Sequence, residues 1–181
     1  MRMLAILGCL ALLIALAQAR DPTPLNPAID MRGFLETASE AAAHRESRRL
    51  SERDFNAWSR EPGTVVLDAR SREKFDLLHI AGAINLSFPD ITVESLAATL
   101  PDRDTRILIY CNNNFENSPR AFPTKRPMAS LNLSTYIALY SYGYRNLYEL
   151  APVLDPQTSM LEFASATAPI AAEIDSPALT R

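Results

Sequence analysis

The chain has 181 residues, of which 48% are apolar and 22% charged, with a formal net charge of −3. This length and apolar content support one globular domain and exclude a fully disordered chain. The slightly acidic balance gives no support for nucleic-acid binding, which requires a basic face. Because the sequence holds only two cysteines, a disulfide-stapled miniprotein and a four-cysteine zinc site are also excluded.

The first 19 residues have the pattern of a secretory signal peptide. Arg2 supplies a positive charge, residues 4–17 form an uncharged apolar run, and Ala17-Gln18-Ala19 offers small residues to a signal peptidase. We therefore expect residues 1–19 to be removed and the protein to be exported, to the periplasm or outside the cell. No membrane contact beyond this segment is expected, with an uncleaved anchor or a lipoprotein site at Cys9 as alternatives.

Residues 20–46 are expected to form an N-terminal extension with one helix. The extension begins with a proline-rich stretch. Apolar side chains then recur at helical spacing, at Met31, Phe34, Leu35 and Ala38.

Beyond this extension, short apolar runs alternate with short helical patterns. The predicted strands cover residues 64–67, 83–86, 106–110 and 146–150. The predicted helices start at Ser51 and cover 71–78, 93–100 and 133–140, the last one capped near Ser130. Such alternation implies parallel strands joined by right-handed crossovers, and therefore an α/β layer fold.

Residues 153–181 are expected to form a C-terminal tail. After Asp155 the sequence consists mainly of Ala, Ser, Thr and Pro with scattered charges. We predict that the tail is partly disordered and that Met160–Phe163 adds one turn of helix.

Cys111 directly follows the predicted strand 106–110. The carboxyl ends of strands in open parallel sheets are where ligands bind. A thiol there is stabilised as a thiolate if several backbone N–H groups converge on it. Asn112, Asn113 and Asn114 come next, and asparagine tolerates the positive φ that such a cradle requires. A free cysteine is often simply a small buried apolar residue, so this position alone leaves the role of Cys111 open.

The segment between Cys111 and Ser130 has little periodicity and holds three prolines, so it is expected to be a long loop. Loops of this length in compact domains are often functional. Three of its residues, Arg120, Lys125 and Arg126, add positive potential suited to an anionic substrate, and Glu116 opposes them.

Three stretches of the chain resemble the motifs of the rhodanese family. They are Val65–Ser71 with Phe75 and His79–Leu86, then Ile107–Cys111, and finally Gly143–Leu150. The resemblance spans about residues 47–152. It implies a rhodanese-like three-layer α/β domain, with a central, mostly parallel sheet of about five strands flanked by helices.

The resemblance also implies a chemistry. Cys111 would take sulfane sulfur from a small anionic donor such as thiosulfate, hold it as a persulfide, and pass it to a thiol or another thiophilic acceptor. No cofactor and no metal is implied, and a protein partner is possible. The positions that would contact substrate are Asn112, Asn113, Asn114, Phe115, Glu116, Asn117 and Arg120.

Asp68, Arg70 and His79 match family positions that support the site structurally. The competing role of His79 as a general base or metal ligand is not supported, because no second ligand lies at a suitable spacing.

The loop after Cys111 departs from the family pattern. The usual loop is short and closed by arginine or glycine, and Asn112–Asn117 contains neither. A binding module with little turnover, whose 112–129 loop grips an anion or a protein partner, is therefore one alternative. A redox role, in which Cys111 pairs with a thiol of another molecule, is a second. A phosphatase of the same fold needs an arginine six positions after the cysteine, where this chain has Asn117, and is excluded.

Overall fold

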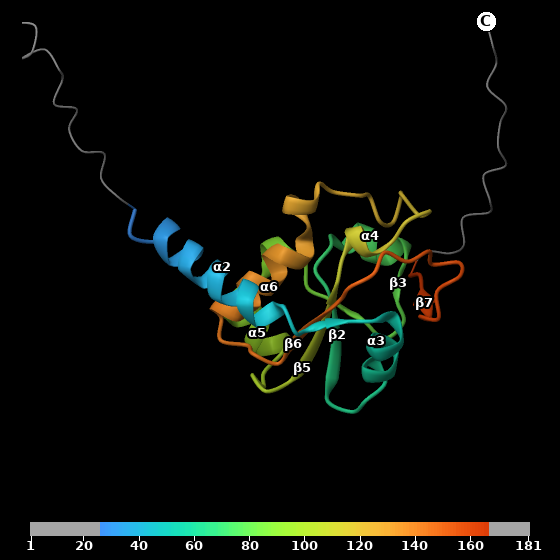
Figure 1. Cartoon of the computed structure of the whole chain (residues 1–181), viewed down its shortest axis with the longest axis horizontal. Helices are drawn as coiled ribbons and strands as arrows, with labels where there is room; N and C mark the ends of the chain where they lie inside the picture. The colour runs from blue at the N-terminus through green and yellow to red at the C-terminus, as the bar shows by residue number, and fades with distance from the viewer. Residues whose placement is uncertain (1–25, 167–181) are drawn as a thin grey trace, which may run out of the picture. The chain divides into compact units, whose positions relative to one another are not determined.

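A computed structural model of the chain describes residues 26–166 (Figure 1). The predicted signal peptide, residues 1–19, and the end of the predicted tail, 167–181, lie outside the described residues. Export therefore stays a prediction. The chain divides into two units, Met1–Arg32 and Gly33–Arg181. The second unit contains the sheet and its helices, whereas the described part of the first is a turn and the start of a helix.

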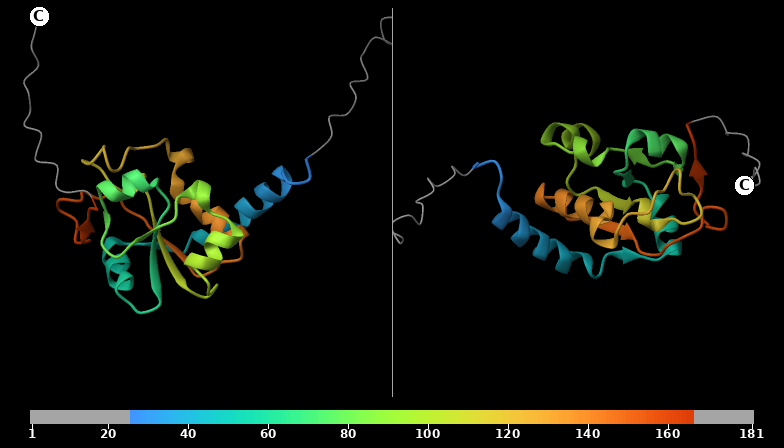
Figure 2. Two further views of the ribbon diagram at one scale, coloured as in Figure 1. Left: turned by 180° about the vertical axis from the view of Figure 1, so that it is seen from behind. Right: turned by 90° about the horizontal axis from the view of Figure 1, so that it is seen from above.

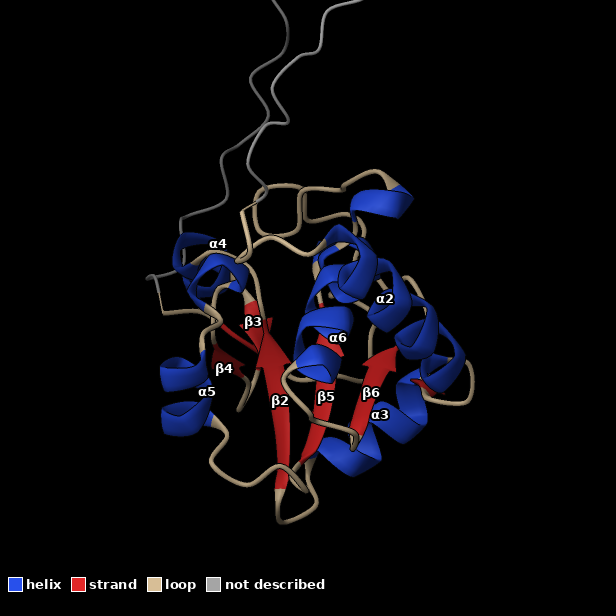
Figure 3. Ribbon diagram, turned by 90° about the vertical axis from the view of Figure 1, so that its left-hand side faces the viewer, coloured by secondary structure: helices blue, strands red, loops and turns tan. Residues whose placement is uncertain are grey.

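Five strands form one sheet in the order β1-β6-β5-β2-β4, and every neighbouring pair is parallel (Figure 3). The strands are β1 (Arg49–Leu50), β2 (Thr64–Asp68), β4 (Ile84–Asn85), β5 (Arg106–Tyr110) and β6 (Leu147–Leu150). The predicted α/β class with a central parallel sheet of about five strands is confirmed.

Helices follow the strands as the sequence pattern predicts. They are α2 (Met31–Arg45), α3 (Glu52–Ser59), α4 (Arg72–Leu77), α5 (Val93–Thr99) and α6 (Leu131–Ser141), with 3₁₀ turns η1 (Phe88–Asp90), η2 (Asn112–Asn114) and η3 (Pro127–Ala129). Ser51 caps α3, since its hydroxyl accepts a hydrogen bond from the N–H of Asp54. Helix α5 begins with a full capping box between Thr92 and Ser95.

The sheet is buried on both faces, and strand β5 shows how. Ile107 and Ile109 belong to a core cluster with residues of α2, α5 and α6. Leu108 and Tyr110 point the other way, into a cluster with Phe55 of α3 and the chain around residues 115–122. Side chains alternate between the two faces because successive residues of a strand point to opposite sides. Figure 2 shows helices on both sides of the strands.

A second, two-stranded sheet joins β3 (His79–Ile80) to β7 (Phe163–Ala164) in antiparallel register. The predicted helical turn at Met160–Phe163 is therefore wrong. Leu161 is buried in the core, and Ala81 N–H donates a hydrogen bond to the carbonyl of Glu162 at 2.8 Å. A single isolated turn is a costly nucleus, so pairing with an available strand edge prevails.

Helix α2 forms where it is predicted, but its apolar stripe is not a core face. Phe34 and Leu35 are 53% and 59% exposed, whereas Ala41 is buried against the sheet. In the described part of the chain, no helix combines the length and apolar character that a membrane crossing would need.

Candidate functional site

Cys111 lies directly after β5, at the carboxyl edge of the parallel sheet, and its side chain is fully buried. Two polar groups contact its sulfur. The backbone N–H of Asn113 donates to Sγ at 3.4 Å, and the hydroxyl of Ser130 lies 3.4 Å from Sγ. Ser130 is the residue before α6, yet its side chain makes no capping hydrogen bond, so its hydroxyl is directed to the sulfur instead.

The backbone after Cys111 forms the short 3₁₀ turn η2 and not the predicted cradle of several N–H groups. The N–H groups of Asn114 and Phe115 bond to the carbonyls of Cys111 and Asn112, at 3.2 and 3.3 Å, and leave one amide for the sulfur. The expected positive φ in the asparagine run is also wrong. Among the described residues other than glycine, only Asn117 has a positive φ, of 58°.

Asn114 fixes the backbone of the cysteine. Its Oδ1 accepts from the N–H of Cys111 at 2.9 Å and from Nδ2 of Asn132 at 3.0 Å. Its Nδ2 donates to the carbonyls of Leu150 and Pro152, at 2.8 and 3.3 Å. The buried amide thus joins the ends of β5 and β6 to α6, which positions Cys111 and leaves Asn114 no group for substrate.

The side chain of Asn113 ties the two ends of the long loop together. Its Nδ2 donates to the carbonyl of Lys125 at 2.7 Å, and its Oδ1 accepts from the N–H of Lys125 at 3.2 Å. Asn112 is buried, and its Oδ1 has no hydrogen-bond partner. Of these two residues, it is therefore Asn113 that holds the two ends of the loop together.

Phe115 is a core residue. It is 2% exposed, its ring lies 4.4 Å from that of Phe122, and its backbone forms a bridge with Leu154. The chain after Cys111 thus crosses to the other face of the sheet, the face that holds Tyr110. In this arrangement the Phe115 side chain therefore cannot contact a substrate at Cys111.

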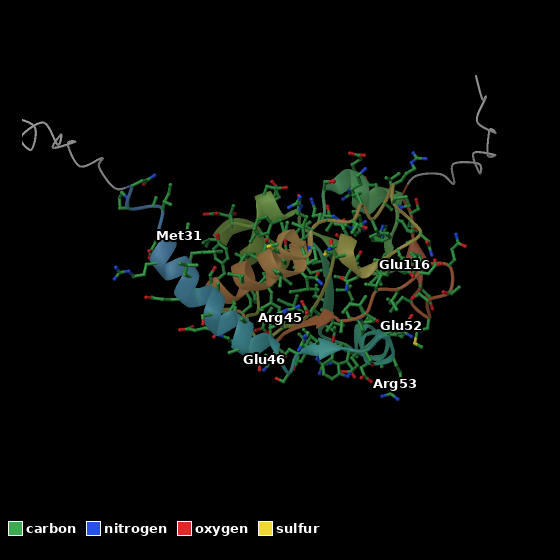
Figure 4. The ribbon with its side chains drawn as sticks, turned by 45° about the horizontal axis from the view of Figure 1, so that its top comes forward. Met31, Arg45, Glu46, Glu52, Arg53 and Glu116 are labelled. Atoms are coloured by element: carbon green, nitrogen blue, oxygen red, sulfur yellow. The ribbon has the colours of Figure 1, made fainter. Side chains whose placement is uncertain are left out.

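The remaining predicted loop residues are exposed, whereas the sulfur is buried. Within residues 26–166, no hydrogen bond joins Glu116, Asn117 or Arg120 to Cys111. Asn117 donates instead to the carboxylate of Asp155 at 2.8 Å. Figure 4 shows Glu116 in a different part of the domain from Arg45.

Asp68 and Arg70 form a fully buried ion pair on the face opposite to Cys111. The guanidinium contacts both carboxylate oxygens, with a shortest distance of 2.6 Å. It also donates to the carbonyls of Ala121 and Leu78, each at 2.7 Å. The pair therefore anchors the returning loop and the chain before β3.

The negative charge of Asp68 also acts on Tyr110. Burial, and then this carboxylate, raise the pKa of the Tyr110 hydroxyl well above its usual range. The hydroxyl therefore stays protonated, and its oxygen accepts from the N–H of Ile80 at 3.2 Å.

His79 makes contacts that belong to the scaffold. Its Nδ1–H donates to the carbonyl of Phe75 at 2.7 Å, and its ring stacks on that of Phe75 at 3.7 Å. Within the described range, no group of three or more His, Cys, Asp and Glu side chains could hold a metal ion.

A pocket of about 300 Å³ lies beside Cys111. Its lining includes Asn113 and Ser130, the two residues that contact the sulfur. The other lining residues are Arg45, Asn114, Pro127, Asn132, Leu133, Glu149, Leu150 and Ala151. The pocket thus reaches the two residues that contact the sulfur, while Cys111 itself is not among its lining residues.

Glu149 shares the face of the sheet on which Cys111 lies. Ile109 pairs with Glu149 across β5 and β6, and Cys111 follows Ile109 by two residues in extended backbone. Strand geometry then places the Cα atoms of Cys111 and Glu149 about 8 Å apart on neighbouring strands. Glu149 is 1% exposed and forms an ion pair with Arg45 of α2. Figure 4 labels Arg45.

The sequence interpretation missed four polar residues of this pocket. They are Arg45, Ser130, Asn132 and Glu149. A usable signal existed for Glu149 alone, because a charged residue within a strand buried on both faces requires a partner.

Comparison with known proteins gives the family. The family model of the rhodanese-like domain matches residues 51–150. No curated protein matches the chain significantly. Similar solved structures include a rhodanese-like domain from Anabaena sp., with 18% identity over 74% of this chain and 92% of that one and a TM-score of 0.47.

Two further solved structures are similar to this chain. A rhodanese with anions from E. coli has 20% identity over 56% of this chain and 98% of that one, with a TM-score of 0.38. A thiosulfate sulfurtransferase from Pseudomonas aeruginosa has 24% identity over 57% of this chain and 17% of that one, with a TM-score of 0.39. On the family match, which covers more than half of its residues, the chain belongs to the rhodanese-like domain family.

Proposed function

We propose that the protein is a sulfurtransferase that carries sulfane sulfur as a persulfide on Cys111. One observation carries this proposal: the sulfur of Cys111 lies at the carboxyl edge of the sheet between the Asn113 N–H and the Ser130 hydroxyl, beside a polar pocket. An N–H and an O–H donor aimed at sulfur stabilise its anionic form.

The chemistry proceeds in two steps. The Cys111 thiolate attacks the outer sulfur of thiosulfate, a new S–S bond forms, and sulfite leaves with the electron pair of the bond that breaks. An acceptor thiolate then attacks the terminal sulfur of the persulfide, and Cys111 leaves as a thiolate. The Asn113 N–H and the Ser130 hydroxyl hold negative charge on sulfur in both steps.

The burial of Cys111 separates this proposal from a redox role. A mixed disulfide with another protein requires an exposed thiol, and Cys111 is 0% exposed. A small donor in the pocket that Asn113 and Ser130 line lies next to the two residues that contact the sulfur. The burial therefore favours transfer of a single sulfur atom over pairing with a protein thiol.

Loading with thiosulfate tests the proposal. The purified protein is incubated with thiosulfate and weighed intact, and a mass increase of one sulfur atom is expected. Cys111→Ala must show no increase, and Ser130→Ala must load more slowly. An unmodified mass, or an equal increase in Cys111→Ala, would contradict the proposal.

A second candidate is a binding module with little turnover. It is favoured by the outward position of Arg120, Lys125 and Arg126, all exposed on the loop that returns to the sheet edge. This candidate expects Cys111 to react with alkylating agents at neutral pH no faster than a free cysteine. Rapid alkylation would favour the sulfurtransferase.

A further inference from the structure

The pocket beside Cys111 holds an ion pair whose hydrogen bonds are incomplete. Arg45 and Glu149 contact each other, but Arg45 Nε and Glu149 Oε2 are buried without a hydrogen-bond partner among the described residues. Asn132, which also lines the pocket, has an unpartnered Oδ1. Buried polar atoms are nearly always paired, because leaving one unpaired destabilises the fold. All three atoms belong to residues that line one pocket, and their unmet hydrogen-bonding capacity indicates groups kept for a ligand.

The chemistry of the three atoms defines what the ligand must offer. Glu149 Oε2 and Asn132 Oδ1 are acceptors, and Arg45 Nε is a donor. The acceptors require a cationic donor such as an ammonium group, and the arginine requires an acceptor such as a carboxylate. Arg45 and Glu149 together carry no net charge, so a ligand that bonds to both side chains is best matched by a zwitterion.

The volume of the pocket and the position of Glu149 restrict the choice of ligand further. The pocket is about 300 Å³, which is the low end for small-molecule sites. Glu149 lies on the strand next to Cys111 and on the same face of the sheet. Because the Cα atoms of Cys111 and Glu149 are about 8 Å apart, a small molecule bound to Glu149 is long enough to reach toward the sulfur.

We propose that this pocket binds the sulfur acceptor, and that the acceptor is a small zwitterionic aminothiol of the cysteine type. Its ammonium group bonds to Glu149 and Asn132, its carboxylate bonds to Arg45, and its thiolate faces Cys111. In the transfer, the S–S bond of the protonated persulfide breaks, Cys111 leaves as a thiolate, and the terminal sulfur and its proton move to the aminothiol. The assignment of this ligand as acceptor rests on the proposed function.

Calorimetric titration of the reduced protein under argon tests the binding. The probes are cysteine, cysteamine without the carboxylate, 3-mercaptopropionate without the ammonium group, and 2-mercaptoethanol without either. Cysteine should bind about tenfold or more tightly than each of the others, because a buried ionic hydrogen bond is lost in each case. Equal binding of cysteine and 3-mercaptopropionate would overturn the proposal.

A variant pair assigns the ammonium contact. Glu149→Gln keeps the shape of the side chain and should abolish the preference for cysteine over 3-mercaptopropionate. The matched control is Glu61→Gln, since Glu61 pairs with Arg106 outside the pocket and should leave the preference unchanged. A preference that survives in Glu149→Gln would overturn the assignment. If Glu149→Gln does not fold, the probe series on the unaltered chain decides alone.

This binding test is independent of persulfide formation. Should thiosulfate fail to load Cys111 while cysteine binds selectively, the proposed function fails and the zwitterion site stands. Should loading succeed while the probes bind equally, the sulfurtransferase stands and the acceptor assignment fails.

Discussion

Two arginine–carboxylate pairs, each with a buried carboxylate, lie on opposite faces of the same sheet. They differ in how many of their polar atoms have hydrogen-bond partners. Around Asp68 and Arg70, the guanidinium reaches both carboxylate oxygens and two backbone carbonyls. Around Arg45 and Glu149, one atom of each side chain has no partner among the described residues. The first pair is closed off by protein, whereas the second lines a pocket.

The difference separates a structural ion pair from a functional one. A fully bonded buried pair fixes the loop that packs on it, here at Ala121 and Leu78. An ion pair in which some polar atoms lack hydrogen-bond partners stabilises the fold little by itself, because the charges lose solvation without gaining all their hydrogen bonds. We therefore expect the two pairs to respond to substitution in opposite ways.

The largest effect is expected for Arg70→Ala. It leaves the buried Asp68 carboxylate uncompensated, so the free energy of unfolding should fall by about 3–5 kcal/mol. Denaturant titration measures this. The control Arg60→Ala removes an exposed pair with Glu162 and should cost less than about 1 kcal/mol. Equal losses in the two variants would contradict the structural role of Arg70.

The next largest effect is expected for Asn114→Ala. Its free energy of unfolding should fall by about 2–4 kcal/mol, because several buried groups lose their hydrogen-bond partner at once. The substitution should also slow sulfur loading, since the backbone of Cys111 is released. Asn56, on α3, bonds to the exposed Arg60, and Asn56→Ala is expected to change stability by less than about 0.5 kcal/mol. Loading at the normal rate in Asn114→Ala would show that the amide does not position the thiol.

The double variant Arg45→Met with Glu149→Leu sharpens the comparison. Replacing a half-bonded buried pair by apolar side chains should leave stability within about 1 kcal/mol of the parent, or raise it. The same variant should lose selective binding of cysteine. A large loss of stability, comparable to that of Arg70→Ala, would mean that both pairs are structural.

The smallest effect concerns pH. Burial, and then the positive charges of Arg48 and Arg145, lower the pKa of His44 in the folded protein. The unfolded chain therefore binds this proton more readily, so stability is retained above about pH 6.5 and declines as the pH falls below it. Denaturation midpoints between about pH 7.5 and pH 5.5 should show this decline. His44→Gln, which can still bond to Tyr136, should reduce it, and an unchanged slope would count against His44 as its source.

The sequence was sufficient for the main architecture because long strands and helices leave periodic patterns. Residues 107–110 are apolar and buried without interruption, as a central parallel strand requires. Strands β1, β3 and β7, of two residues each, leave no period to detect, so their pairing depends on tertiary contacts. The equally short β4 lies within the predicted strand 83–86.

The site was less predictable than the fold. Position and family resemblance place Cys111 at the strand end, but the bonds that Asn113 and Asn114 make depend on Lys125, Asn132 and other distant groups. A charged residue in a buried strand indicates that Glu149 needs a partner, but its place beside Cys111 follows only from the register of β5 and β6, which no local pattern reports.

The pairing of β7 with β3 has a practical consequence for anyone preparing fragments of this protein. The family match ends at residue 150, yet Leu161 and Phe163 fill the core and Ala166 N–H still bonds to the carbonyl of Asp76. A clone that stops at the family boundary would remove this strand and uncover apolar surface. Expression products should therefore extend at least to Ala166, and shorter ones should prove insoluble.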